Sequence, residues 1–399
     1  MMYPTIYLGR KSMINKFLAI ISDQVNIRFA WEKVKNYILS GDYWFDELDL
    51  ASFELNLEDN LKIISESFLK MKYRLSPIKP LPFPKTSDIK GKEKFRQIFY
   101  ISIIDQVAWV AFVNIVGPYL DSMMPTWSYG NRLFRSIWIE EDNDGKKKKK
   151  IGRYRSSSGK LYLPFQQSWP VYKRHIALAI NKMTNCSNSN YLDERTKEED
   201  LLNQGLLNKQ QCPFIKKEYW ERKLDISKGD KQLYWCSIDF KKFYPSIKLD
   251  IIKKTILANL PKNWILYAEK LLNCLLDFKI FIDDDSLDFV KDINIRKNSK
   301  SYNHLPTGLY VSGFLANVAM LNIDNIISKE LDRYNIAHFR FVDDHIILAY
   351  SFDDLTEWIC NYFKIINAGK NGIDINFDKV KPIEFSNYIK TYIKNKGLY

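Results

Sequence analysis

Cysteine and histidine are scarce in this chain, and their spacing excludes several classes of protein. The 399 residues include five cysteines and four histidines. The cysteines are odd in number and never form a CxxC pair, which argues against a disulfide framework and indicates a reducing compartment. No cysteines and histidines combine at the spacing of a zinc site. A structural zinc site is therefore not expected.

Secretion signals and common hydrolase motifs are also missing. The apolar piece FLAII near the N-terminus is too short for a signal peptide, and no small-residue cleavage site follows it. No stretch is predicted to supply the ~20 apolar residues of a membrane-spanning helix. GxSxG, P-loop and HExxH motifs are absent. We therefore expect a cytoplasmic protein without a membrane partner.

Basic residues exceed acidic ones by a wide margin. The chain has 60 Lys and Arg against 47 Asp and Glu, a net charge of +13. Such an excess favours a polyanionic partner, nucleic acid before a membrane surface, although a merely basic surface gives the same count. Hydrophobic residues make up 46% of the chain. This is ample core for two or three subdomains.

Periodicity divides the chain into four segments. Residues 1–70 have helical spacing, and residues 71–135 contain a proline-rich connector, a β-rich stretch and a helix. Residues 136–230 are predicted to be an insertion. Residues 231–399 predict an α+β fold with helices on an antiparallel sheet. There we expect strands in LYWCSIDF, around FVDD and in IDINFDKVKPIEF, and helices in LDIIKKTILANL, WILYAEKLLNCLLDF, SGFLANVAMLNIDNIISKELDRY and LTEWICNYFKIINAG.

The predicted insertion contains a basic and aromatic stretch. Between Gly145 and His175 there are ten Lys or Arg and no acid, with Tyr and Trp between them. Aromatic rings stack on bases while cations neutralise phosphates, so the stretch is a candidate nucleic-acid site. The run Lys146–Lys150 by itself is equally typical of a solvated loop tip. The candidate nucleic-acid-binding residues are Arg132, Lys146, Lys147, Lys148, Arg153, Arg155, Lys173 and Arg174.

Three carboxylates are the candidates for chemistry. Asp239 ends an apolar strand, and Asp343 and Asp344 interrupt FRFVDDHIILAY. Adjacent like charges resist burial unless a cation compensates them. If the pair lies in a hairpin turn beside the end of the Asp239 strand, the three converge. Such a cluster suits two Mg²⁺ ions, with Mn²⁺ as an alternative, which stabilise the attacking and leaving oxygens of a phosphoryl transfer.

Two other acidic runs have a different sequence context. Asp283–Asp285 is predicted to lie in a solvated loop. Asp353 and Asp354 are predicted to begin a helix, where carboxylates interact favourably with the helix dipole. Neither run is expected to carry chemistry.

Five elements in order resemble the bacterial, non-retroviral reverse transcriptases. FVDD at 341–344 is similar to the YxDD hairpin of that family, and SIDFKKFYPSI to its first metal motif. The other elements are LPTGLYVSGFLANVAM, GIDINFDKVKP and KFRQIFYIS with the later WSYGNRL. The resemblance implies a right-hand polymerase with fingers at 71–135, a palm at 231–399 and a helical fingers segment at about 250–300.

The resemblance also implies roles for individual residues. Asp239, Asp343 and Asp344 would be catalytic and would bind two metal ions, with the Phe240 carbonyl as a further ligand. The implied nucleotide-binding residues are Lys94, Arg96, Tyr244, Thr307, Gly308 and Lys379. Of these, Lys94 and Arg96 would grip the triphosphate. Tyr244 would exclude a 2′-hydroxyl, with core packing as the alternative, and Lys379 would act near the pyrophosphate, with a surface lysine as the alternative.

Three departures narrow the resemblance. Thr307 stands where the family usually has Gln, the stretch from Arg132 to Lys231 is unusually long, and only 55 residues follow Asp344, so a thumb is expected to be missing or supplied by a partner. These traits resemble the defence-associated and abortive-infection reverse transcriptases of the "unknown group", relatives of retron and group II intron enzymes. Membership implies anti-phage defence, often with a non-coding RNA or a second protein.

Three functions follow from these patterns. The first is a metal-dependent DNA polymerase that uses dNTPs and an RNA template. The second is the same fold making DNA without a template or under protein direction. The third is a non-catalytic nucleic-acid-binding scaffold. Expected partners are RNA, the DNA product, dNTPs and either a second protein subunit or another copy of the chain.

Overall fold

The computed structural model describes residues 16–41, 45–85, 94–141, 147–184, 233–281, 301–331, 336–369 and 372–397. Within these ranges, the strands form a three-stranded antiparallel sheet and two two-stranded ribbons, and helices pack on both faces of the sheet. Their buried apolar side chains form one continuous hydrophobic core. The predicted α+β class is confirmed.

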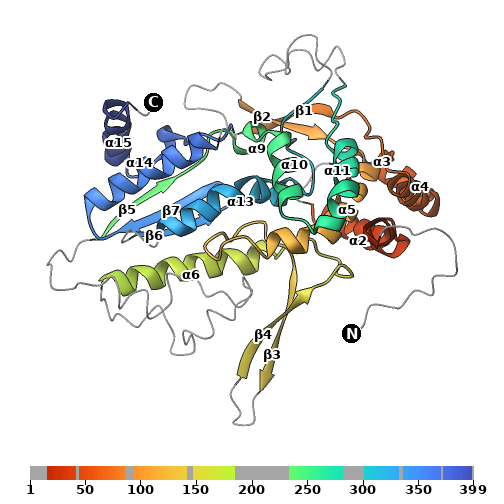
Figure 1. Cartoon of the computed structure of the whole chain (residues 1–399), viewed down its shortest axis with the longest axis horizontal. Helices are drawn as coiled ribbons and strands as arrows, with labels where there is room; N and C mark the ends of the chain where they lie inside the picture. The colour runs from red at the N-terminus through yellow and green to blue at the C-terminus, as the bar shows by residue number, and fades with distance from the viewer. Residues whose placement is uncertain are drawn as a thin grey trace.

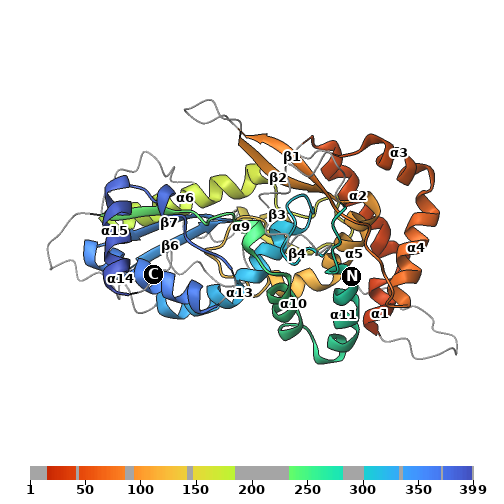
Figure 2. The same ribbon diagram turned by 90° about the horizontal axis from the view of Figure 1, so that it is seen from above.

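Four helices precede the first strand. They are α1 (Lys16–Ile21), α2 (Gln24–Leu39), α3 (Glu47–Leu55) and α4 (Leu57–Leu69). The side chains of Asp23 and Asp46 cap α2 and α3 by accepting backbone N–H bonds, 2.8 Å long at Val25. The helices pack beside α5 (Figure 2). The helical prediction for this region is therefore confirmed where the structure describes it.

Helix α5 (Ile103–Asp121) is nearly apolar on all sides and lies in the core. Among the described residues it is the one helix long and apolar enough to cross a membrane by length and composition. Such a run was not predicted from the sequence. Most of the helix is buried inside the protein, as is usual for a core helix.

The proline-rich connector forms strand β1 (Lys79–Lys85), which pairs with β2 (Lys94–Tyr100). Proline lacks an N–H donor and is therefore confined to sheet edges, and a two-stranded ribbon consists of edges only. The Phe99 amide donates to the Thr307 carbonyl at 2.7 Å. This bond ties the ribbon to the loop that precedes α13.

Strands β3 (Arg135–Glu141) and β4 (Lys147–Tyr154) form a hairpin that projects from the body of the protein (Figure 1). Lys147 to Lys150 lie in β4, so the loop-tip interpretation of these four lysines is wrong. The register places Lys147 opposite Glu141 and Lys148 opposite Glu140. Two lysine positions of the run are thus paired with acidic positions in the backbone register of the ribbon.

The three-stranded sheet has the order β5–β7–β6, and all pairs are antiparallel. The strands are β5 (Tyr234–Ile238), β6 (Ile336–Phe341) and β7 (Asp344–Ala349). Residues Val342 and Asp343 form the turn between β6 and β7, because Phe341 pairs with Asp344. The predicted strands around FVDD and in LYWCSIDF are confirmed.

Helices α13 (Ser312–Leu331) and α14 (Phe352–Ala368) cover one face of the sheet. His338 in β6 accepts a 3.2 Å bond from the indole of Trp358 in α14. Two positions on, Arg340 pairs with Asp324 in α13. Since side chains alternate along a strand, these contacts mark a single face.

Helix α6 (Phe165–Thr184) packs against the opposite face (Figure 1). The ring of Phe341 in β6 meets Trp169 edge-on, with centroids 4.9 Å apart. Trp169, which was predicted to be part of an insertion, therefore lies directly against the hairpin of β6 and β7. We call this hairpin, which carries Asp343 and Asp344, the catalytic-candidate hairpin.

The remaining elements follow the predictions except at the C-terminal side. Helices α10 (Leu249–Ala258) and α11 (Lys262–Leu275) are present as predicted and are separated at Pro261, and the short helix α9 (Phe243–Ser246), which was not predicted, precedes them. Asp353 and Asp354 lie in the first turn of α14, as expected. Asp283–Asp285 falls outside the described residues.

The strand predicted in IDINFDKVKPIEF is wrong. Only isolated bridges link this segment to β5 and to Phe240. The short 3₁₀ helix η4 (Phe377–Lys379) interrupts it, and helix α15 (Ile383–Asn395) begins after Pro382. The alternating apolar residues suggested a strand, but proline at this point favours the start of a helix.

Candidate active site

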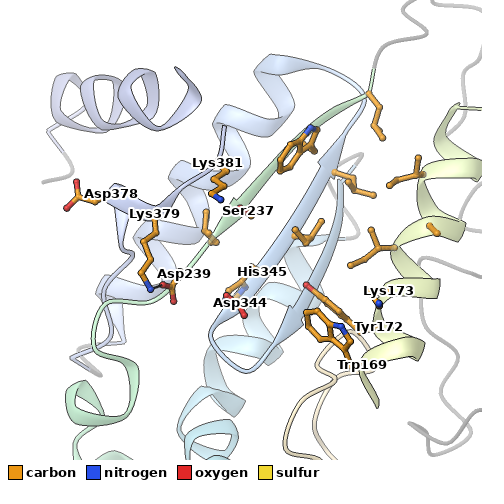
Figure 3. Close-up of a pocket in the computed structure, with 18 residues that line it drawn as sticks. Trp169, Tyr172, Lys173, Ser237, Asp239, Asp344, His345, Asp378, Lys379 and Lys381 are labelled. Carbon is orange, nitrogen blue, oxygen red and sulfur yellow. Dashed lines mark hydrogen bonds and ion pairs between the residues drawn. The ribbon is translucent and has the colours of Figure 1, made fainter. Parts of the chain in front are cut away.

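The register of the sheet brings the three candidate carboxylates to one end of it. Ile238, the last residue of β5, pairs with His345, so Asp239 follows directly beside Asp344. Both side chains line the same cavity (Figure 3). Asp343 occupies the adjoining turn and its charge interacts with those of Asp239 and Asp344. The convergence expected from the sequence is thus present.

The electrostatics of this cluster are unfavourable without a cation. Burial raises the pKa of Asp343 to about 6, and the charges of Asp239 and Asp344 add to the effect. Burial and Asp239 also raise the pKa of Asp344. Carboxylates held close together in a partly dry site resist ionisation together. A bound cation would therefore favour the ionised form of the cluster.

Lys379 supplies one such positive charge. Its ammonium forms a hydrogen-bonded ion pair with Asp239, which raises the pKa of the lysine (Figure 3). The lysine is held there because the segment around it runs beside β5. The Asn376 amide donates to the Asp239 carbonyl at 2.7 Å, and the Ser237 amide donates to the Lys381 carbonyl at 2.9 Å. Helix η4 then directs Lys379 back over the carboxylate.

The carboxylate oxygens at this end of the sheet are possible ligands for a divalent metal ion. In the described ranges no group of three or more His, Cys, Asp or Glu side chains is placed to hold a metal ion. Mg²⁺ needs less, because it keeps several waters and takes one or two carboxylates together with substrate phosphates. Asp239, Asp343 and Asp344 offer only hard carboxylate oxygens, and Lys379 already places a cation on Asp239. This chemistry fits Mg²⁺ or Mn²⁺.

Lys379 and a metal ion compete for Asp239, which gives a testable prediction. Replacing Lys379 by Met should lower the Mg²⁺ or Mn²⁺ concentration for half-maximal thermal stabilisation about threefold, since an ion pair whose lysine is largely exposed contributes up to ~1 kcal/mol. The measurement is a thermal-shift titration with each ion. Lys390→Met is the matched control, because it removes an equal charge from Asp378 nearby. An unchanged midpoint in Lys379→Met would contradict competition.

The turn that carries Asp343 is strained and firmly supported. Val342 has a φ of 62°, which is rare for a β-branched residue. The Arg340 guanidinium donates to the Val342 carbonyl at 3.2 Å and to Asn317 in α13 at 2.9 Å. A Cβ on Gly130 would lie 2.5 Å from the Val342 side chain, so only glycine fits there. Such strain is typical of functional sites.

A cavity of about 1000 Å³ extends from the carboxylates between α6 and the sheet (Figure 3). One wall carries Trp169, Tyr172 and Lys173 of α6, and the other carries Trp235 of β5 with apolar side chains of β7. The side chains of Lys379 and Lys381 also reach this cavity. Aromatic faces combined with cations are suited to bases and phosphates.

Four of the six predicted nucleotide-binding residues lie in strand β2 and in the loop before α13. Lys94 and Arg96 lie in β2, opposite Lys85 and Phe83. Thr307 and Gly308 adjoin that ribbon through the bond from Phe99 to Thr307. Their roles toward a nucleotide stay predictions.

The backbone conformation of Gly308 and a close contact with β2 both require glycine at this position. Its φ is 116°, and a Cβ there would lie 2.2 Å from the Phe99 carbonyl oxygen. This close contact is with the backbone of strand β2. Tyr244 lies half-buried in α9, and its hydroxyl accepts a 3.3 Å bond from Asn131. The role of the Phe240 carbonyl stays a prediction.

Arg132 cannot be a nucleic-acid contact, which corrects the sequence prediction. It is buried, and its guanidinium bonds the Asp121 carboxylate at 2.9 Å and the carbonyls of Pro125 and Ser128. Its positive charge is thus used inside the protein. The sequence could not reveal this, because it shows the charge of Arg132 but not its partner.

The other basic candidates are distributed over three elements. Lys147, Lys148 and Arg153 lie in β4, and Lys146 falls outside the described residues. Arg155 follows β4 and is exposed, while Lys173 and Arg174 lie in α6. Their contacts with nucleic acid stay predictions.

Sequence reasoning missed the residues that support the site. Asn317 and Asp324, seven positions apart on α13, are fully buried, as is Arg340. Polar residues at helical spacing within an apolar helix are a signal for a buried network. Asn131 was also missed, although it lies within SYGNR.

A comparison of the chain with family sequence models gives one match. The family is described as "Reverse transcriptase (RNA-dependent DNA polymerase)", and the match covers residues 183–389, just over half of the chain. The matched region contains β5, the β6–β7 hairpin and all three carboxylates.

The chain belongs to the reverse transcriptase family.

No curated protein matches the chain. Reverse transcriptases are in general RNA-directed DNA polymerases, hence nucleotidyltransferases, that use divalent metal ions such as Mg²⁺ and bind templates and dNTPs. The catalytic-candidate hairpin of this reverse transcriptase lies within the part of the chain that defines the family.

Proposed function

We propose that this reverse transcriptase is an active DNA polymerase that copies RNA and serves anti-phage defence. The observation that carries the catalytic part is the convergence of Asp239, Asp343 and Asp344 at the end of the sheet. A scaffold without catalysis has no use for mutually repelling carboxylates in a partly buried, strained turn. The defence role and the relation to retron and group II intron enzymes rest on the sequence resemblance.

Individual residues of the chain have separate roles in the proposed reaction. Asp239, Asp343 and Asp344 hold divalent ions, with the Phe240 carbonyl as a further ligand. Bound Mg²⁺ or Mn²⁺ offsets the negative charge that develops on the phosphates. Lys379 holds a proton near Asp239, in position to act on the pyrophosphate side. Tyr244 excludes the 2′-hydroxyl of a ribonucleotide.

The proposed division of the chain follows the right-hand polymerase. Residues 71–135 are the fingers, residues 231–399 the palm, and about 250–300 a helical extension of the fingers. The segment 136–230 is an insertion that contributes α6 to the site. The enzyme acts in the cytoplasm, with a second protein subunit or another copy of the chain as its partner.

A second candidate, synthesis without a template or under protein direction, has one specific observation in its favour. Helix α6 packs Trp169 against Phe341, two residues from Asp343, on the sheet face beside the cavity. This contact narrows the space open to a template duplex. Thr307, where the family usually has glutamine, also favours synthesis without a template or under protein direction.

A primer-extension assay with purified protein separates these functions. The reactions contain Mg²⁺ or Mn²⁺ and each dNTP singly and together, with and without RNA template, after nuclease removal of copurifying RNA. Template-dependent product supports the first function, and product without template supports the second. EDTA should abolish either. Bound nucleic acid without any product would instead support the scaffold.

A further inference from the structure

The loop Ser128–Arg132 connects the catalytic-candidate hairpin with Tyr244. At one end the Tyr129 amide donates to the Arg340 carbonyl at 2.9 Å, and the Arg340 amide donates to the Trp127 carbonyl at the same distance. At the other end Arg132 is fixed by its ion pair with Asp121. The loop is thus held on both sides, and its middle residues have little freedom.

Asn131 lies at the centre of this loop in a left-handed conformation, with a φ of 55°. Asn317 of α13 holds the backbone there, because its amide donates to the Gly130 carbonyl at 2.8 Å. Asparagine adopts this conformation more readily than most residues, so the position suits it.

The side chain of Asn131 is confined between two neighbours. Its Nδ2 donates to the Tyr244 hydroxyl at 3.3 Å. A Cβ built on Gly313, near the start of α13, would lie 2.5 Å from the same Nδ2. The amide therefore lies over the bare backbone of Gly313 with its donor directed at the tyrosine.

We propose that Asn131 is a positioning residue that sets the sugar specificity of the polymerase by holding the Tyr244 ring in place. The inference rests on the proposed function of Tyr244. A ring excludes a 2′-hydroxyl only if its edge is fixed to within a fraction of an ångström. The bond from Asn131 supplies this constraint at the far end of the ring, and Gly313 leaves the space that it needs.

The test measures kcat and KM for dNTP and rNTP incorporation by the full chain. Asn131→Gly keeps the left-handed backbone and removes the amide. It should lower the dNTP-to-rNTP ratio of kcat/KM roughly five- to tenfold, the value of one hydrogen bond, with kcat for dNTPs nearly unchanged. Asn131→Asp restores a partner, because the tyrosine hydroxyl can donate to it, and should keep the ratio within about twofold.

A substitution in α13 tests the same hydrogen bond between Asn131 and Tyr244. Gly313→Ala should displace the Asn131 amide and lower the ratio as Asn131→Gly does, and alanine is favourable within a helix. Tyr244→Phe should lower the dNTP-to-rNTP ratio of kcat/KM as much as Asn131→Gly does. The double variant that combines these two substitutions should show no further loss in this ratio. Additive losses, or an equal change in KM for both nucleotide types, would overturn the positioning role.

Tyr244→Ala separates failure of this inference from failure of the proposed function. A wild-type ratio in Tyr244→Ala, or no incorporation by the wild-type enzyme, would overturn the role of Tyr244 and the inference with it. A collapsed ratio in Tyr244→Ala beside an unchanged one in Asn131→Gly would overturn only the inference.

Discussion

Asp343→Asn is expected to reduce DNA synthesis by at least about 10³-fold, because the amide cannot supply the charge that a metal ion needs at this position. The measurement is single-nucleotide incorporation at saturating Mg²⁺. Asp353→Asn is the matched control, since Asp353 is an exposed carboxylate in the first turn of α14. Activity of Asp343→Asn within tenfold of the wild type would contradict a catalytic role for the hairpin.

The same substitution is expected to stabilise the metal-free protein. Asp343 has a pKa of about 6 when folded, against ~3.9 in an unfolded chain, so its ionisation opposes folding. The opposing effect is absent below about pH 4 and complete above about pH 6. Asp343→Asn should therefore raise the free energy of unfolding by about 1 kcal/mol at pH 7.5, after allowance for solvent screening.

The stabilisation has its own pH test. In EDTA, the difference between Asp343→Asn and the wild type should shrink as the pH falls from 6 toward 4. Denaturant melts at several pH values measure it. A difference that is constant over this range, or of the opposite sign, would mean that the folded protein does not raise the pKa of Asp343.

Arg340→Ala is the second change with a large expected effect. Arg340 and Asp324 form an ion pair in which both side chains are fully buried. Burial raises the pKa of Asp324 to about 6 in spite of the arginine. Removing the arginine leaves an unpaired buried carboxylate and frees the strained Val342 carbonyl, at an expected cost of about 3–5 kcal/mol. Urea or thermal unfolding measures the loss.

Two further variants show whether the loss of stability in Arg340→Ala comes from the unpaired buried charge. Arg28→Ala is the control, because the Arg28–Glu58 pair is exposed and should contribute less than ~1 kcal/mol. Arg340→Met combined with Asp324→Leu removes both charges and should recover much of the stability. If the hairpin needs Arg340 for its geometry, the double variant should fold but synthesise DNA poorly. Full activity in it would show that the turn forms without Arg340.

Much of the site could be predicted because its signals are local. The alternation of apolar residues around FVDD predicts two strands, and the like-charged pair between them predicts a turn. Antiparallel pairing then places that turn beside the end of another strand, and Asp239 was the carboxylate available there. Helices α10, α11 and α14 follow from spacing of the same local kind.

The errors came from tertiary and cross-strand contacts that residue type does not reveal, or from a single proline. Arg132 was assigned to nucleic acid on its charge, but the fold buries it against Asp121 at the end of α5. The lysines of β4 were compatible with a loop tip until pairing with β3 fixed them in a ribbon. The last predicted strand had the right alternation, yet η4 and Pro382 end it.

The sequence by itself determined the family, the three carboxylates and most of the strands and helices, because these depend on residue type and on short-range periodicity. Only the tertiary structure decided which charges meet. It placed Lys379 on Asp239, Arg340 on Asp324, and Asn131 between Gly313 and Tyr244. These pairs join residues far apart in the chain, and their energies depend on burial and on distances of a few ångströms, neither of which a residue's own identity contains.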